Sequence, residues 1–217
     1  CESLEHWQHK TLGSLHLYAH PEVTLSIVED NLQMPGMALI GYMIDANHPN
    51  RSNIDILVEI QKSSKSVNSI SKYLYNISGR FVLIINNLTD TFVFHDPCGL
   101  RSVYYTRNKE KIYVGSQPLV FQYVLSLEPG ARFINYNESE YKNGTLEHWI
   151  PSGCSLYENI YHLVSNHYLQ FSTFRQERYW PTQTLQQKQA NDVVNDASRL
   201  LVNLMSAASR RFSLALS

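Results

Sequence analysis

The sequence lacks most of the features that define several broad classes of protein. It has three cysteines among 217 residues, and they form neither a Cys-x-x-Cys pair nor the dense pattern of a disulfide framework. No apolar run approaches the roughly 20 residues that a membrane span requires, and no signal-peptide pattern opens the chain. These absences lead us to expect no membrane partner and a cytoplasmic location.

Neither sign of charge is in excess. Lys and Arg number 18 and Asp and Glu number 19, which gives a formal net charge of -1 at pH 7. A nucleic-acid surface needs clustered basic residues, so we expect no nucleic-acid partner. His16 and His20 are four residues apart, as metal ligands on a helix would be, but the alternation around them indicates a strand. We therefore expect no metal site.

Hydrophobic residues make up 43% of the chain and fall into strand and helix patterns. Segments with a β pattern are 15–17, 23–27, 37–44, 81–85, 91–95, 103–106, 112–115, 168–171 and 177–179. The four segments between 81 and 115 are divided by turns rich in Asn, Asp, Gly and Lys, which predicts a meander of hairpins. Short helices are predicted at 54–60, 67–74 and 118–125, the second of them starting near Ser66 or Ser69.

The composition changes at Pro181, where a Gln-rich connector begins. An amphipathic helix follows over about residues 191–209, and residues 212–217 start like a buried parallel strand. The apolar stripe of this helix consists of Val193, Val194, Ala197, Leu200, Leu201, Leu204, Met205 and Ala208. We therefore expect a first domain, a linker and the start of a truncated second domain, with boundaries 1–181, 182–190 and 191–217.

Three blocks together resemble the asparagine synthetase family. Residues 79–84 (GRFVLI) and 95–106 (HDPCGLRSVYYT) are similar to that family's G-x-F-A-F strand and R-D-x-x-G-x-x-P-L-Y-Y hairpin. Residues 150–160 (IPSGCSLYENI) resemble its Y-L-P-x-x-x-T-L-F-x-x-I segment, which runs on to an R-Y-W seen here at 178–180. The third block is the terminal helix and strand, which in the family leads into the ATP loop S-G-G-x-D-S.

The resemblance implies an α+β fold of the N-terminal-nucleophile type, a sandwich of two antiparallel sheets between helix layers. It also implies a C-terminal helix and strand from a truncated α/β domain. In such proteins an N-terminal Cys attacks glutamine, and the released ammonia reaches a second domain that uses ATP and Mg²⁺. Ser217 would be the first residue of the ATP loop. We expect no cofactor in this fragment itself.

The glutamine site implied by the resemblance departs from the family's pattern. The Asn-Gly pair that stabilises the oxyanion falls on Ile40-Gly41, and Ile40 has no donor to offer. The acidic residue before the glycine of G-x-F is replaced by Ser78, which precedes Gly79. Cys1 stands where the nucleophile belongs, but the polar residues after it do not match a strand. An arbitrary first residue is the competing interpretation of Cys1.

The other two cysteines lie in turn-like segments. Cys98 follows Asp96-Pro97, which indicates a small packed residue, and Cys154 follows Gly153; we expect structural roles for both. Three functions remain open. The first is a non-catalytic glutaminase-like domain of an ATP-dependent amide-forming ligase. The second is a glutamine-hydrolysing asparagine synthetase with diverged motifs, and the third is a non-enzymatic interaction module on the same fold. The expected partners are the remainder of the synthetase domain and a second copy that pairs through the terminal helix.

Overall fold

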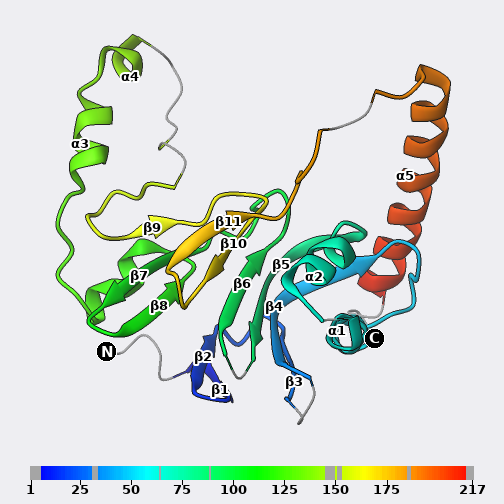
Figure 1. Ribbon diagram of the computed structural model, residues 1–217, viewed down its shortest axis with the longest axis horizontal. Coiled ribbons are helices and arrows are strands. Elements are labelled where there is room, and N and C mark those ends of the chain that lie inside the picture. Colours follow the sequence, from blue (N-terminus) through cyan, green and yellow to red (C-terminus); the bar gives the residue numbers. More distant parts are fainter. Residues whose placement is uncertain are drawn as a thin grey trace.

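The chain folds into antiparallel sheets, with α1, α2 and α5 at one end of the molecule and α3 and α4 at the other (Figure 1). The computed structural model describes residues 6–30, 34–63, 65–87, 89–144, 150, 153–184 and 187–213. Every strand pair among these residues is antiparallel. The architecture is therefore mixed α+β, as the resemblance implied, and the finer description of a full sandwich between two helix layers stays a prediction.

The largest sheet has six strands in the order β11-β10-β6-β5-β4-β3. Their bounds are Leu25–Val28 for β3, Gly36–Asp45 for β4, Ile77–Asn86 for β5, Thr91–His95 for β6, His167–Gln170 for β10 and Arg175–Arg178 for β11. A three-stranded sheet contains β8 (Lys111–Gly115), β7 (Tyr104–Asn108) and β9 (Tyr161–His162) in that order, and β1 (Gln8–Leu12) pairs with β2 (Leu15–Ala19).

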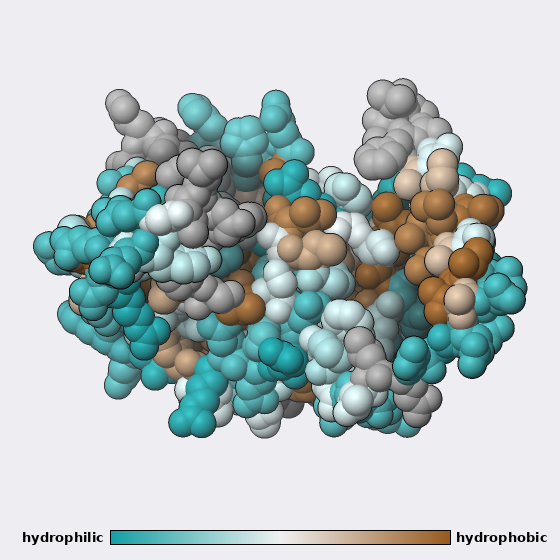
Figure 2. All heavy atoms as spheres, turned by 90° about the horizontal axis from the view of Figure 1, so that it is seen from above, coloured by the Kyte–Doolittle hydropathy of each residue, from teal (hydrophilic) through white to brown (hydrophobic). Residues whose placement is uncertain are grey.

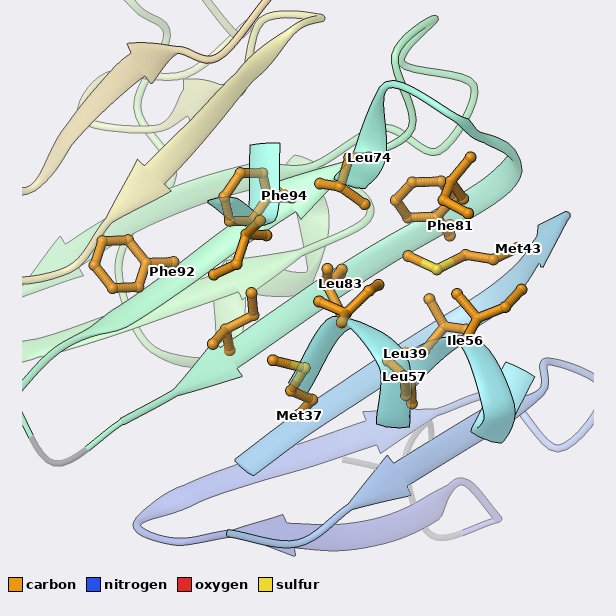
Figure 3. Packing of buried hydrophobic residues seen from close by; sticks show 14 of the residues in the cluster. Met37, Leu39, Met43, Ile56, Leu57, Leu74, Phe81, Leu83, Phe92 and Phe94 are labelled. Carbon is orange, nitrogen blue, oxygen red and sulfur yellow. The ribbon is translucent and has the colours of Figure 1, made fainter. Parts of the chain in front are cut away.

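One face of the six-stranded sheet is covered by α1 (Asn53–Ser63) and α2 (Val67–Leu74). The apolar side chains of β4, β5 and β6 meet those of the two helices in one buried cluster (Figure 3). The second helix begins as predicted, because Ser66 and Ser69 exchange the two hydrogen bonds of a capping box. Leu39, Leu57 and Leu83 are fully buried in this cluster, and each contributes about 1.5–3 kcal/mol by leaving water.

The opposite face of the sheet carries a second buried cluster, formed with other strands rather than with helices. It joins Ala38, Val82 and Val93 of the large sheet to Leu17 of the β1–β2 hairpin and Tyr105 of β7. A short 3-10 helix, η1 (Pro118–Tyr123), contacts β7 and β8. The helices α3 (Ala131–Asn137) and α4 (Glu140–Gly144) bury no residue of their own.

Two details of the sequence prediction are wrong. The predicted meander breaks after β6, because β10 rather than β7 pairs with that strand, and β7 begins a separate sheet. The terminal helix α5 (Ala190–Ser213) runs past the point where a strand was expected, since residues 212 and 213 are still helical. The remaining residues of that expected strand lie outside the described part of the chain.

Helix α5 touches the rest of the protein mainly near its C-terminal end. Ala207 is buried, Arg210 donates a 2.7 Å hydrogen bond to Asn50, and Arg211 donates to Asn53. The apolar stripe upstream is exposed: Val194 is 62% and Leu201 58% accessible. Figure 2 shows hydrophobic side chains gathered over this helix, at the right of the view. The helix thus folds back over only part of its length.

Candidate functional site

The four residues expected at the degenerate glutamine site lie on two paired strands. β4 pairs with β5 along the whole length of both strands, so that Ile40 faces Val82, Gly41 faces Phe81 and Ile44 faces Ser78. Ile40 is partly buried and packs against the cluster between the sheets. Its side chain therefore contributes to the core, and it has no polar atom to offer a substrate.

The two glycines are required by the close approach of the strands. Gly41 has a φ of +104°, and a Cβ there would lie 2.3 Å from the carbonyl oxygen of Arg80. Gly79 has a φ of +131°, and its Cβ would lie 2.3 Å from the carbonyl oxygen of Tyr42. Both backbones are in a region that L-residues rarely adopt. Each glycine thus allows the other strand's backbone to pass at a distance that any side chain would prevent.

The polar backbone groups of Gly41 are already paired. Its N–H donates to the carbonyl oxygen of Thr24 at 2.8 Å, and its carbonyl accepts a 3.0 Å hydrogen bond from the side-chain amide of Asn53. The Asn53 side-chain oxygen in turn accepts the N–H of Met43 at 3.1 Å. Asn53 is buried, so these bonds are sheltered from water. The N–H that an oxyanion hole would use at this position is therefore engaged within the protein.

A tight loop after β6 is built around Asp96. This carboxylate is fully buried and accepts the backbone N–H groups of Leu100 at 2.9 Å and of Arg101 at 3.0 Å. The Asp96 N–H donates to the carbonyl of Phe81 at 3.0 Å, which ties the loop to β5. The Asp-x-x-Gly-x-Arg pattern thus has a structural reason, because one carboxylate satisfies two N–H groups that the turn leaves without backbone partners.

The loop places Arg101 against Gly41. The Arg101 Nε lies 2.7 Å from where a Gly41 Cβ would stand. It donates to the carbonyl of Arg80 at 3.3 Å, while the Arg80 Nε donates to the carbonyl of Leu100 at 3.2 Å. Partial burial, and then the neighbouring charge of Arg80, lower the pKa of the Arg101 guanidinium. The space beside Gly41 therefore carries a half-buried cation.

Two further side chains, those of His95 and Tyr179, help to fix this loop. Both ring nitrogens of the buried His95 face backbone carbonyls, that of Arg101 at 3.2 Å and that of Val164 at 3.0 Å. The hydroxyl of Tyr179 donates to the His95 carbonyl at 3.2 Å. Burial and the nearby Asp96 carboxylate raise the pKa of the Tyr179 phenol, so the hydroxyl stays protonated as a donor. The loop is thus fixed to three separate segments of the chain.

Ile40, Gly41, Ser78 and Gly79 lie on the paired strands β4 and β5, with Ile40 four register positions from the partner of Ser78, and their role as a glutamine site stays a prediction. Cys1 and Ser217 lie outside the described residues. Cys98, expected to be packed, is exposed at the turn, and Cys154 is half-buried. Thr24, Asn53 and Arg101 were missed as site residues. Only Arg101 lies in a block that the sequence singled out, residues 95–106, whereas the other two reach Gly41 through the fold.

Within the described ranges, no group of three or more His, Cys, Asp or Glu side chains is arranged to hold a metal ion. No helix in the same ranges has the length and apolar character needed to cross a membrane.

Comparisons with known proteins give matches among solved structures alone. No protein-family model matches the chain, and no curated protein sequence matches it. Among solved structures, the chain is similar to the glutamine phosphoribosylpyrophosphate (PRPP) amidotransferase from B. subtilis, which was solved in complex with ADP and GMP. The identity is 14% and the TM-score 0.46, with 76% of this chain and 33% of that chain covered. The chain thus spans about a third of the length of that protein, and a score of this size does not assign the fold.

Proposed function

We propose that residues 1–181 form a class II glutamine-amidotransferase-like domain that does not hydrolyse glutamine. The arrangement of the resembling segments supports this. The Ile40-Gly41 pair and the Ser78-Gly79 pair lie on the adjacent strands β4 and β5, and the loop of Asp96 is bonded to Phe81, which lies opposite Gly41. Their glycines are needed where the two strands touch. Short motifs that matched the family by chance would have no reason to lie next to one another in the folded chain.

The observation that carries the absence of activity is the hydrogen bonding of Gly41. A glutaminase of this type needs a side-chain donor and the next backbone N–H at its oxyanion position. Here Ile40 supplies no donor, and the Gly41 N–H is given to Thr24. Losing one such donor costs about 10²–10³ in rate. With both donors lost, we expect no measurable turnover.

The parent protein, in this proposal, is an asparagine-synthetase-like ligase that forms an amide by activating a carboxylate with ATP. Residues 191–217 would begin its synthetase domain after the linker 182–190. ATP and Mg²⁺ would bind at the loop that Ser217 opens, which lies outside the described residues, so no step of the reaction is assigned to groups in this structure. The first domain then acts as a scaffold and lid for the second.

One observation favours the second function, a diverged but active glutaminase. The Arg101 guanidinium lies beside Gly41, and a cation there would stabilise a developing oxyanion. The third function, a non-enzymatic interaction module, is favoured by the exposed apolar face of α5. Activity measurements separate the first two functions, and the association state bears on the third.

The first prediction is that the chain releases no ammonia from glutamine. The measurement is a coupled ammonia assay on protein whose N-terminal Cys1 has been verified by mass spectrometry. The Ile40→Asn/Ser78→Asp double variant should stay inactive too, because the Gly41 N–H remains bonded to Thr24. Turnover above background that disappears in both Cys1→Ala and Arg101→Met would instead establish the diverged glutaminase.

The partner of α5 is the second part of the proposal. In the parent protein the exposed stripe would pack against the remainder of the synthetase domain; in the present chain we propose that it packs against a second copy. Val194, Leu201 and Met205 are each more than half exposed, at 62%, 58% and 64%. Each loses about 1.5–3 kcal/mol relative to a buried position, which favours association.

The second prediction is therefore a dimer at high micromolar concentration. Light scattering should give twice the monomer mass for the chain, and the monomer mass after Leu201→Lys or truncation after Trp180. Arg199→Ala on the polar side of the same helix is the control and should remain dimeric. A monomer at every concentration would rule out self-association through α5.

A further inference from the structure

The β1–β2 hairpin has one face in the core and one in water. Leu12, Leu17 and Ala19 are buried, whereas the opposite face displays aromatic and imidazole rings. His9 lies directly across from Tyr18, and Thr11 across from His16, so His9 and His16 are diagonal neighbours on that face. All four of these residues are exposed. Nothing in the glutaminase-like function makes use of these rings.

The two histidines meet nitrogen to nitrogen. His9 Nε2 and His16 Nδ1 are 3.1 Å apart, while their ring centroids are 5.3 Å apart and their planes differ by 11°. Because the nitrogens are so much closer than the ring centres, the rings meet edge to edge in nearly one plane rather than face to face. Tyr18 stacks on His9 at a centroid distance of 4.7 Å, which restricts the ring from one side.

We propose that His9 and His16 form a two-histidine chelating site for Zn²⁺, Ni²⁺ or Cu²⁺. Two imidazole nitrogens that bind one Zn²⁺ at about 2.0–2.1 Å are roughly 3.3 Å apart in a tetrahedral site, which is close to the separation found here. Imidazole is the ligand that suits these borderline ions. The positions not filled by the two histidines are filled by water.

The proton balance of this binding is simple. In the free pair, one ring donates the N–H between the two nitrogens and the other ring accepts it. When the ion binds, that proton moves to the other nitrogen of the donating ring, so both facing nitrogens offer a lone pair. Starting from the neutral pair, this transfer leaves each imidazole neutral. The rings must turn so that their lone pairs converge, and their exposure to solvent allows this.

His20 provides a matched control on the same hairpin face. Its Nδ1 accepts the N–H of Glu22 at 3.3 Å, and its ring lies edge-on to Trp7 with centroids 5.9 Å apart. It therefore has its own neighbours and is not a member of the pair. The four-residue spacing of His16 and His20 therefore did not predict a shared site. The ring of His16 instead meets that of His9 on the adjacent strand.

The test is calorimetric titration of ZnCl₂ and NiCl₂ into the untagged full chain, with MgCl₂ as a hard-ion comparison. We expect one Zn²⁺ or Ni²⁺ per chain and no heat from Mg²⁺. His9→Gln and His16→Gln should each weaken binding at least about tenfold, since even an outer-shell partner is worth 10–100-fold in metal affinity. His20→Gln should bind as the unaltered chain does.

Folding of the variants is checked by their thermal unfolding without metal, which should be unchanged because both side chains are exposed. The ion should also raise the Tm of the unaltered chain but not of His9→Gln, because it binds only the folded pair. Equal affinity in His9→Gln and the unaltered chain would place the ion elsewhere and overturn the proposal. Absence of binding at millimolar Zn²⁺ and Ni²⁺ would overturn it as well.

Discussion

Gly79→Ala should destabilise the protein by about 3–5 kcal/mol. A methyl group at this position would stand 2.3 Å from the carbonyl oxygen of Tyr42 on the neighbouring strand, and the φ of +131° is unfavourable for any L-residue. Neither problem is relieved by a rotamer change, because the close atoms all belong to the backbone of Tyr42 and Met43. Since domains of this size are stable by about 5–15 kcal/mol, the variant should lose a large part of its stability. Urea unfolding followed by far-UV circular dichroism measures the loss.

Gly144→Ala is the matched control for this substitution. Gly144 ends α4, and a Cβ there would have no described atom within 4 Å. Its free energy of unfolding should therefore stay within about 0.5 kcal/mol of the unaltered chain. If Gly79→Ala behaved in the same way, β4 and β5 would have to be farther apart than the structure places them.

Asp96→Ala should lower the free energy of unfolding by about 3–4 kcal/mol. The carboxylate is fully buried and accepts two backbone N–H groups, from Leu100 and Arg101. Its removal leaves both donors without a partner in the interior, and each unsatisfied group costs about 1–3 kcal/mol. The loop that places Arg101 against Gly41 should become more mobile in this variant. Asp96→Asn should retain part of the stability, because its amide oxygen still accepts one of the two bonds.

The control for the carboxylate is Asp192→Ala on the exposed first turn of α5. This variant should change the free energy of unfolding by no more than about 0.5 kcal/mol. Hydrogen exchange measures the loop directly: in Asp96→Ala the amides of Leu100 and Arg101 should exchange faster, while those of β4 remain protected. Unchanged protection of both loop amides would contradict the role assigned to Asp96.

Local patterns predicted most of the strands and the main helices. The apolar run at 37–44 became β4, and Ser66 caps α2 as expected. The strand β1 was missed because its sequence, QHKTL, is polar at most positions and buries only Leu12. The meander failed for a related reason, since nothing local to His95 indicates that the next strand along the chain joins another sheet. Pairing between distant strands is decided by packing and not by sequence period.

The candidate site was predictable only in part. The resemblance identified Gly41 and Gly79, and the structure gives their physical reason, the close backbone approach of β4 and β5. The replacement of a donor by Ile40 was also readable from the sequence. The hydrogen bond from the Gly41 N–H to Thr24 could not be predicted from the sequence. Nothing in the sequence near either residue indicates that the two strands pair there.

The outer strand of the large sheet has a consequence for how copies of the protein can meet. β11 has the sequence RQER at one end of the strand order, and three of its four residues are exposed. If two such strands paired antiparallel in end-to-end register, Arg175 would stand opposite Arg178 of the other copy. Like charges directly opposite one another repel, and charged edge strands resist joining. The sheet is therefore protected at this edge against growth into an aggregate.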